Sequence, residues 1–391
     1  NVPVEALRPF EFAGTETSTK RELAHLLFRH WGLTRELMLG DQLIHWVLVS
    51  LRNKELAETL KRIKHVIAET SAKNEIQASE QLMRMILLFD PGGPIRINTL
   101  SFHLDGIDAL WAELMRNKTQ TELDILSKFI EHTMSAYWLD IQYDAGPEYV
   151  MPEAVNAISL KLDRIRLFVR NAGLGFGPER VLYELNPEMP CQSPLFADEY
   201  IHTLPVLLQH LDKLAPKLKE QEPLDRHSAA VMANRLGVLH GVKLHALVAH
   251  PGLASHPGVI ALQFIASAQS RCGNMQLPGL THWLAMRILP ALDVIRSRTL
   301  RARVKALMVE RAKTGYAQRM SELVIQSNYA AADVSGYGRA AGAYRSNIEK
   351  IKYYRSDAAI KRHSENLGFG IAMFFAYVML AIALYKTWSM Q

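Results

Sequence analysis

The sequence predicts an all-α fold, in which a large, water-soluble helical body is followed by a single transmembrane helix near the C-terminal end. Of the 391 residues, 49% are hydrophobic, which is enough to bury one large core or two modest ones. Apolar residues recur at helical spacing along most of the chain. One long apolar run without a charge lies close to the C-terminus. These three observations together predict the fold class.

The predicted transmembrane helix covers residues 367–386. The 19 residues from Leu367 to Tyr385 carry no charge. As a helix they would measure roughly 28 Å, close to the thickness of a hydrocarbon core. Tyr385 and Trp388 lie where aromatic side chains favour the headgroup level. A core helix of a soluble fold is the alternative, but such a helix usually carries a polar stripe, and this run has none.

The charge distribution predicts on which side of the membrane the body lies. From Arg287 to Arg362 there are 16 lysines and arginines against 6 acidic residues, although the net charge of the whole chain is only +6. Cytoplasmic and matrix-facing flanks are enriched in such cations, so we expect the body on that side. Cations at this position also attract anionic lipid headgroups. Those nearest the apolar run are Lys350, Lys352, Arg355, Lys361 and Arg362.

Small residues recur within the apolar run and indicate a contact with other transmembrane helices. Gly368, Ala372 and Ala376 are spaced four residues apart, which gives a flat face for close packing in lipid. A single uncharged helix cannot conduct ions by itself, so transport by this chain alone is not expected. The candidate membrane and partner contacts are therefore these three residues, the five cations and Trp388.

The body is expected to consist of helices separated by glycine and proline breaks. Capping-box patterns at Thr19–Glu22 and Thr119–Glu122 predict two helix starts. Gly32 is expected to end the first of these helices. Other apolar-periodic segments predict helices at 37–51, 54–70, 75–89, 106–116, 152–170, 195–218, 224–248, 259–271 and 278–313, with a short extended piece at 95–100.

A last long helix is expected to run from Tyr316 into the membrane. Gly336, Gly338 and Gly342 lie inside it and predict a hinge or break, because each costs about 1 kcal/mol relative to alanine in a helix. Segment 171–194 is rich in glycine and proline and is predicted to be an irregular connection between domains. The predicted division is an N-terminal helical region at 1–170, this connection at 171–194, a second helical region at 195–314, a basic juxtamembrane segment at 315–366 and the transmembrane helix at 367–386.

A group of histidines with one cysteine contains residue types that bind zinc. Their spacing argues against a zinc site, because His240 and His245 are five residues apart and do not share a helix face well. The chain also contains no HExxH and no paired CxxC pattern. We therefore expect no metal ion and no other cofactor. The group comprises His240, His245, His250, His256, Cys272 and His282.

Three other features could suggest chemistry but favour structural roles. Gly173–Glu179 is glycine-rich, yet the segment before it reads as a charged helix rather than a buried strand, so a helix stop is favoured over a phosphate loop. Cys191 and Cys272 lie in no recognisable catalytic context. The cations of Arg296–Lys313 are interleaved with an apolar stripe and accompanied by few aromatic residues, which favours protein or lipid contact over nucleic acid.

These features lead us to expect a structural accessory subunit of a multi-subunit inner-membrane complex rather than an enzyme. In architecture alone, the layout looks like that of lineage-specific accessory subunits of mitochondrial ATP synthases or respiratory complexes. The chain begins at Asn1 rather than Met, which suits a processed, imported protein or one trimmed at its start. Two cysteines are too few for a disulfide framework and suit a reducing compartment such as the mitochondrial matrix.

Three alternatives remain open from the sequence. The first is a bacterial inner-membrane component of a secretion or conjugation machine, with its body in the cytoplasm. The second is a membrane-tethered metal enzyme that uses the histidine group. The third is a tail-anchored adaptor that recruits a soluble partner and is found outside any large complex.

Overall fold

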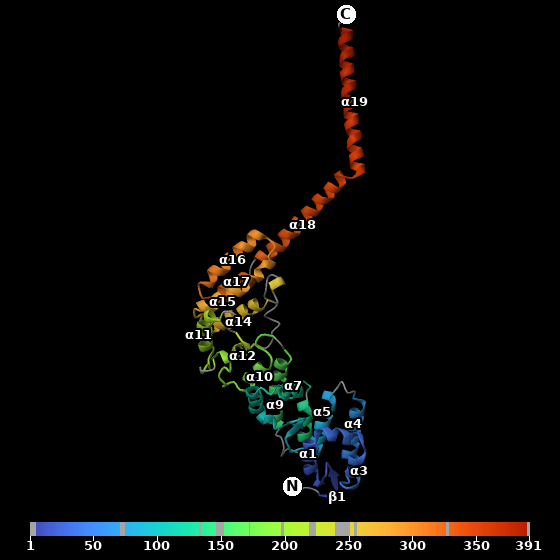
Figure 1. The fold of residues 1–391 in the computed structure, drawn as a ribbon, viewed down its shortest axis with the longest axis vertical. Coiled ribbons are helices and arrows are strands. Elements are labelled where there is room, and N and C mark those ends of the chain that lie inside the picture. Colours follow the sequence, from blue (N-terminus) through green and yellow to red (C-terminus); the bar gives the residue numbers. More distant parts are fainter. Residues whose placement is uncertain are drawn as a thin grey trace.

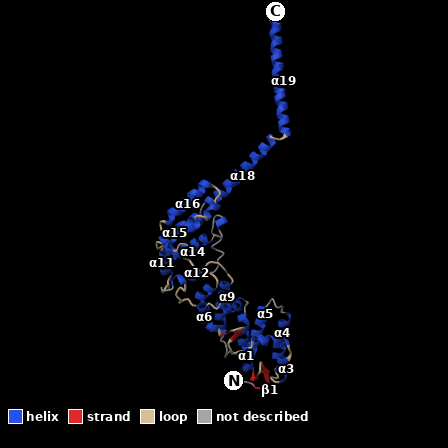
Figure 2. Ribbon diagram, in the orientation of Figure 1, coloured by secondary structure: helices blue, strands red, loops and turns tan. Residues whose placement is uncertain are grey.

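The computed structural model confirms an all-α fold with one long apolar helix at the C-terminal end (Figures 1 and 2). Strands are few and short. The structure describes residues 5–70, 75–132, 134–145, 152–171, 173–196, 199–218, 224–238, 251–253, 256–325 and 328–388.

The elements follow one another in this order along the chain. The first half contains β1 (Glu5–Phe12), β2 (Thr15–Thr19), α1 (Lys20–Arg29), α2 (Trp31–Leu39), α3 (Gln42–Val49), α4 (Lys54–Glu69), α5 (Glu75–Phe89), β3 (Ile95–Ile97), β4 (Leu100–Phe102), α6 (Ile107–Asn117), α7 (Gln120–Glu131), α8 (Met134–Ala145), α9 (Pro152–Val169) and α10 (Pro178–Leu185). The second half contains α11 (Leu204–Leu214), α12 (Arg226–Leu236), α14 (Pro257–Arg271), α15 (Pro278–Ile288), α16 (Arg298–Ala312), α17 (Ala317–Ile325), α18 (Asn328–Tyr354) and α19 (Asp357–Trp388). Short 3-10 turns lie at Leu104–Gly106, Pro194–Phe196, Ala215–Lys217, Pro251–Leu253 and Ala291–Val294.

The described body has two hydrophobic cores, and α5 contributes to both. The smaller core lies among β1 and the helices α1 to α5. Leu82, Met85 and Ile86 of α5 belong to this core, whereas Met83 and Leu87 on another side of the same helix belong to the larger one. A helix that is apolar on most sides is buried on most sides. Packing of α5 therefore joins the two parts of the body.

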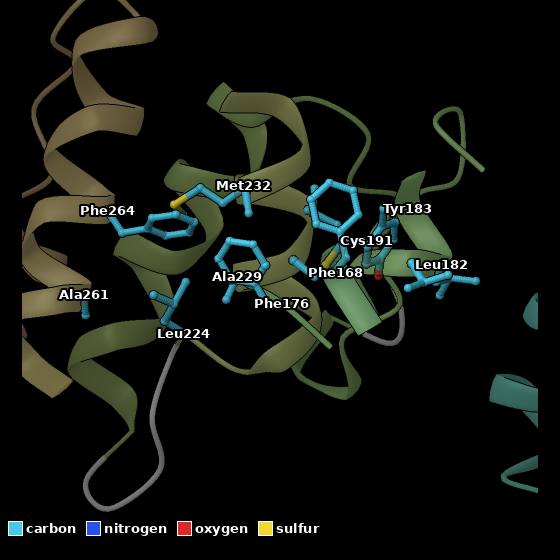
Figure 3. Packing of buried hydrophobic residues seen from close by; sticks show 14 of the residues in the cluster. Phe168, Phe176, Leu182, Tyr183, Cys191, Leu224, Ala229, Met232, Ala261 and Phe264 are labelled. Carbon is cyan, nitrogen blue, oxygen red and sulfur yellow. The ribbon is translucent and has the colours of Figure 1, made fainter. Parts of the chain in front are cut away.

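The larger core extends from α5 to α17 and includes the centre shown in Figure 3. There Phe168, Phe176 and Phe264 of α14 pack in one core with Ala229 and Met232 of α12. Gly175 has a φ of +81°, and a Cβ on it would lie 2.8 Å from the Cβ of Ala233. Glycine at this position therefore allows the chain to approach α12 closely.

The sequence predicts an irregular connection at 171–194. The structure differs, because this segment contains the helix α10. Pro178 begins this helix, and Arg180 is completely buried within it. The guanidinium group of Arg180 lies 2.7 Å from a carboxylate oxygen of Glu184 and 4.5 Å from the centroid of the Phe168 ring. Side chains before, within and after the segment belong to one core. The proposed domain division itself stays a prediction.

Two small antiparallel hairpins accompany the helices. The β1–β2 pair precedes α1 and was not predicted, although the apolar Phe10 and Phe12 alternate with polar residues along β1. Its turn uses Ala13 and Gly14, both with positive φ, as tight hairpin turns require. The β3–β4 pair contains the extended piece that was expected at 95–100.

Helix boundaries agree with the sequence at some positions and correct it at others. The capping box at Thr19–Glu22 is confirmed, since each residue accepts a hydrogen bond from the backbone N–H of the other. Gly32 does not end α1, because α1 ends at Arg29 and Gly32 lies inside α2. Thr119 does precede a helix, but its side chain makes no capping hydrogen bond. The C-terminal part of the expected helix 224–248 lies outside the described residues.

The last two helices protrude from the body. Figure 1 shows α18 leaving beside α16 and α17, and α19 continuing away from it after a bend. The C-terminus consequently lies at the end of the molecule opposite to the N-terminus. This projecting pair, α18 and α19, together with Arg355 at the junction between them, contains every candidate contact residue that the sequence predicted.

Candidate functional site

The first turns of α18 are fixed to the body by one buried carboxylate. Asp333 is only 3% exposed, and its two oxygens accept hydrogen bonds from the backbone N–H groups of Arg296 (2.9 Å) and Ser297 (2.8 Å). The guanidinium group of Arg296 also lies 4.1 Å from the centroid of the Tyr337 ring. Because Ser297 caps the N-terminus of α16, the negative charge lies at the positive end of that helix. The base of α18 is thus held electrostatically.

The hinge predicted at Gly336, Gly338 and Gly342 was wrong. The helix α18 continues unbroken through all three positions. A Cβ on any of them would meet no described atom within 4 Å, so the body does not require glycine there. Their propensity cost of about 1 kcal/mol each evidently does not break a helix that is 27 residues long.

The break occurs instead at Arg355 and Ser356. Ser356 closes α18, because its backbone N–H donates to the carbonyl of Tyr353 at 2.9 Å. The Ser356 hydroxyl also accepts from the backbone N–H of Ala359 at 3.3 Å and so caps the start of α19. A serine followed by Asp357 is a helix-start signal that sequence reasoning missed. We call this junction the elbow, meaning residues 353–360.

The helix α19 is long and apolar enough to cross a membrane. The candidate span covers Asp357–Lys386, has a mean hydropathy of 2.3 and contains no buried residue in its apolar window. Large side chains such as Phe369 (70% exposed) and Phe374 (64% exposed) have no cover from the body. Within the described structure, α19 is therefore not part of the hydrophobic core of the body.

The small residues of α19 form an open face. Gly368, Ala372 and Ala376 are all exposed and follow one another at four-residue spacing along an unbroken helix. Within the described chain, no atom lies within 4 Å of where a Cβ on Gly368 would be. The face is therefore accessible to another helix, although the structure contains none.

The structure gathers the predicted cations around the elbow. Lys350 and Lys352 lie in the last turns of α18, Arg355 lies in the break, and Lys361 and Arg362 lie in the first turns of α19. All five are exposed. Trp388 lies at the far end of α19 and is 77% exposed. Cations and Trp388 consequently flank the apolar segment at opposite ends.

The histidine group is only partly described. His240, His245 and His250 lie outside the described residues, whereas His256 caps the N-terminus of α14 by accepting from the backbone N–H of Gly258. His282 is an exposed residue of α15. Among the residues that the structure describes, no group of three or more His, Cys, Asp or Glu side chains is placed to hold a metal ion.

The two cysteines and the basic run at Arg296–Lys313 lie in surroundings that suit structural roles. Burial raises the pKa of Cys191 to about 11, and burial also raises the pKa of Cys272, so both thiols stay protonated at neutral pH. In α16 the apolar stripe is confirmed, because Val304 and Met308 are buried. The ammonium group of Lys305 in α16 lies 2.7 Å from a carboxylate oxygen of Asp293 in the same body.

The fold and the projecting pair together define a helical chain in which the described residues include one candidate transmembrane helix. Comparison with protein-family models, with curated proteins and with solved structures finds no match for this chain.

Proposed function

We propose that the chain is a single-pass membrane protein that acts as a structural accessory subunit of a multi-subunit inner-membrane complex. The observation that carries this proposal is the outward exposure of α19 along its whole apolar length. Exposed apolar surface costs about 25 cal/mol per Å² in water, so a helix of this kind needs lipid or other helices around it. The body would then be held at the membrane surface by α18.

The orientation follows from the charges that flank α19. All five cations near the elbow lie on the body side of the apolar segment, and Lys386 lies directly after it. The positive-inside rule therefore favours a body on the matrix or cytoplasmic side. We propose the mitochondrial inner membrane, with the body in the matrix. A bacterial inner membrane with a cytoplasmic body is the alternative.

A structural role is favoured because α19 carries no charge in its apolar run and offers a face of small residues. Such a helix anchors a body and packs beside other helices, but it cannot conduct ions alone. ATP synthase and the respiratory-chain complexes are the first assemblies to test, since they are large and rich in transmembrane helices.

The test is separation of gently solubilised native membranes on a native gel, with mass spectrometry following this chain. We expect comigration at fixed stoichiometry with the subunits of one large complex, which would also name that complex. The control is the same membrane solubilised harshly, from which the chain should migrate alone. Migration as a free species after gentle solubilisation would contradict a subunit role and favour the adaptor alternative.

A further inference from the structure

The elbow between α18 and α19 contains a cavity of about 800 Å³. Its lining residues are exposed apart from the half-buried Ala359, so it is an open crevice at the bend rather than an enclosed pocket. It is lined by Tyr353, Tyr354 and the α19 residues Ala359, Ile360, Arg362, His363, Ser364, Asn366, Leu367, Gly368 and Ile371. The cavity thus begins at the cationic flank and ends on the apolar segment.

The lining residues of α19 begin with the apolar Ala359 and Ile360 next to the bend. The polar Arg362, His363 and Ser364 come next along the helix, and Leu367, Gly368 and Ile371 of the apolar segment lie nearest the C-terminus. At 1.5 Å per residue, the polar group lies roughly 5–8 Å before Leu367, where the charge-free run begins. A headgroup layer is about 5–7 Å deep on each side of the hydrocarbon core. The polar part would therefore lie at headgroup level and the apolar part at acyl-chain level.

We propose that the cavity at the elbow binds one anionic phospholipid, with its phosphate at Arg362 and one acyl chain along Leu367 and Ile371. This inference rests on the proposed function, because the cavity meets a bilayer only if α19 spans one. The positive charge of Arg362 is complementary to the negative charge of the phosphate. An arginine side chain also presents several N–H donors in a planar arrangement that matches the phosphate oxygens. The hydroxyl groups of Tyr353 and Tyr354 lie on the α18 side, where tyrosine suits the interface.

The bend at the elbow is what brings residues of both helices to one cavity. A straight continuation of α18 into α19 would carry Tyr353 and Tyr354 away from Arg362 along one axis. The break at Arg355 and Ser356 lets the end of α18 turn aside, so that residues of both helices line one cavity. A lipid in this cavity would bridge the two helices and stiffen the junction.

The decisive comparison uses two neighbouring cations. Arg362 lines the cavity, whereas Lys361 carries the same charge but is not among the lining residues. The full chain is reconstituted in nanodiscs of phosphatidylcholine with a minor fraction of phosphatidylglycerol, and retained lipid is measured by native mass spectrometry. Arg362→Gln should lower phosphatidylglycerol retention about fivefold, which corresponds to about 1 kcal/mol per cation. Lys361→Gln should change retention much less. An equal loss of phosphatidylglycerol retention in the two variants, or no loss in either, would overturn the proposed site.

A second comparison tests the acyl-chain part. A side chain on either Gly368 or Gly370 would meet no described atom within 4 Å, but only Gly368 lines the cavity. Gly368→Leu should therefore reduce lipid retention, and Gly370→Leu should not. A photoreactive residue placed at Ile371 should give a lipid adduct in native membranes. An adduct with a protein instead would mean that a partner helix occupies the cavity, and would overturn the proposal.

Failure of the lipid site is distinguishable from failure of membrane insertion. Each variant is also floated with vesicles of phosphatidylcholine alone, which contain no anionic lipid. A chain that floats but shows no difference between Arg362→Gln and Lys361→Gln overturns only the lipid site. A chain that does not float at all overturns the membrane anchor and, with it, the lipid site.

Discussion

At the scale of single residues, Gly175 combines a positive φ with a close approach to a neighbouring helix, so the fold tolerates a side chain there poorly. Its positive φ disfavours other residues, and the Ala233 Cβ and the Ala229 carbonyl oxygen would lie 2.8 Å and 3.0 Å from an added Cβ. The sequence shows a glycine-rich stretch here but not which helix it would touch. Burial of Gly175 against α12 is a long-range contact that local periodicity does not contain.

The substitution Gly175→Ala should lower the free energy of unfolding of the chain by about 3 kcal/mol. About 1 kcal/mol reflects the positive φ and the rest reflects overpacking against α12. Gly273→Ala is the control, because Gly273 has a φ of +75° but open space around it, and it should cost only about 1 kcal/mol. Denaturant titration of the chain in detergent measures both. Equal losses in the free energy of unfolding would show that Gly175 does not pack closely against α12.

At the scale of elements, the attachment of α18 depends on Asp333. Asp333→Ala should loosen the base of α18 by about 2–3 kcal/mol, because two partly buried backbone N–H groups lose a charged acceptor. Hydrogen–deuterium exchange should then be faster in the first turns of α18 and around Ser297. Glu349→Ala removes an exposed carboxylate from the same helix and should leave this exchange unchanged. Unchanged exchange in Asp333→Ala would refute the attachment.

Elements with local signals were predictable from the sequence. The capping box at Thr19–Glu22 and the proline at Pro152 marked helix starts that the structure confirms. The break predicted at Gly336 was wrong because glycine propensity is a weak signal inside a long helix, whereas the capping signal of Ser356 marked the actual break. The helix within 171–194 was missed because Gly and Pro suggested only a loop, although Pro178 is typical of a first helical turn.

At the scale of the whole molecule, the sequence predicted which residues make up the candidate membrane site but not how they are arranged in space. The apolar run and the cations were visible in the sequence because hydropathy and charge are local properties. The elbow was not, since it depends on the bend after Tyr354, which brings the end of α18 and Arg362 of α19 to one cavity. The same holds for α5, whose two apolar sides join the two cores of the body.

The most direct test of the central claim is alkaline carbonate extraction of membranes that carry the full chain. We predict that the chain stays in the membrane fraction. The double variant Phe375→Arg with Met379→Arg should shift it to the soluble fraction, because each arginine near the centre of the span costs about 2.5–3.5 kcal/mol. The matched control is Tyr344→Arg with Ile351→Arg, which adds the same charge at exposed positions of α18 and should leave the chain in the membrane. Recovery of the unaltered chain in the soluble fraction would contradict a membrane anchor in α19.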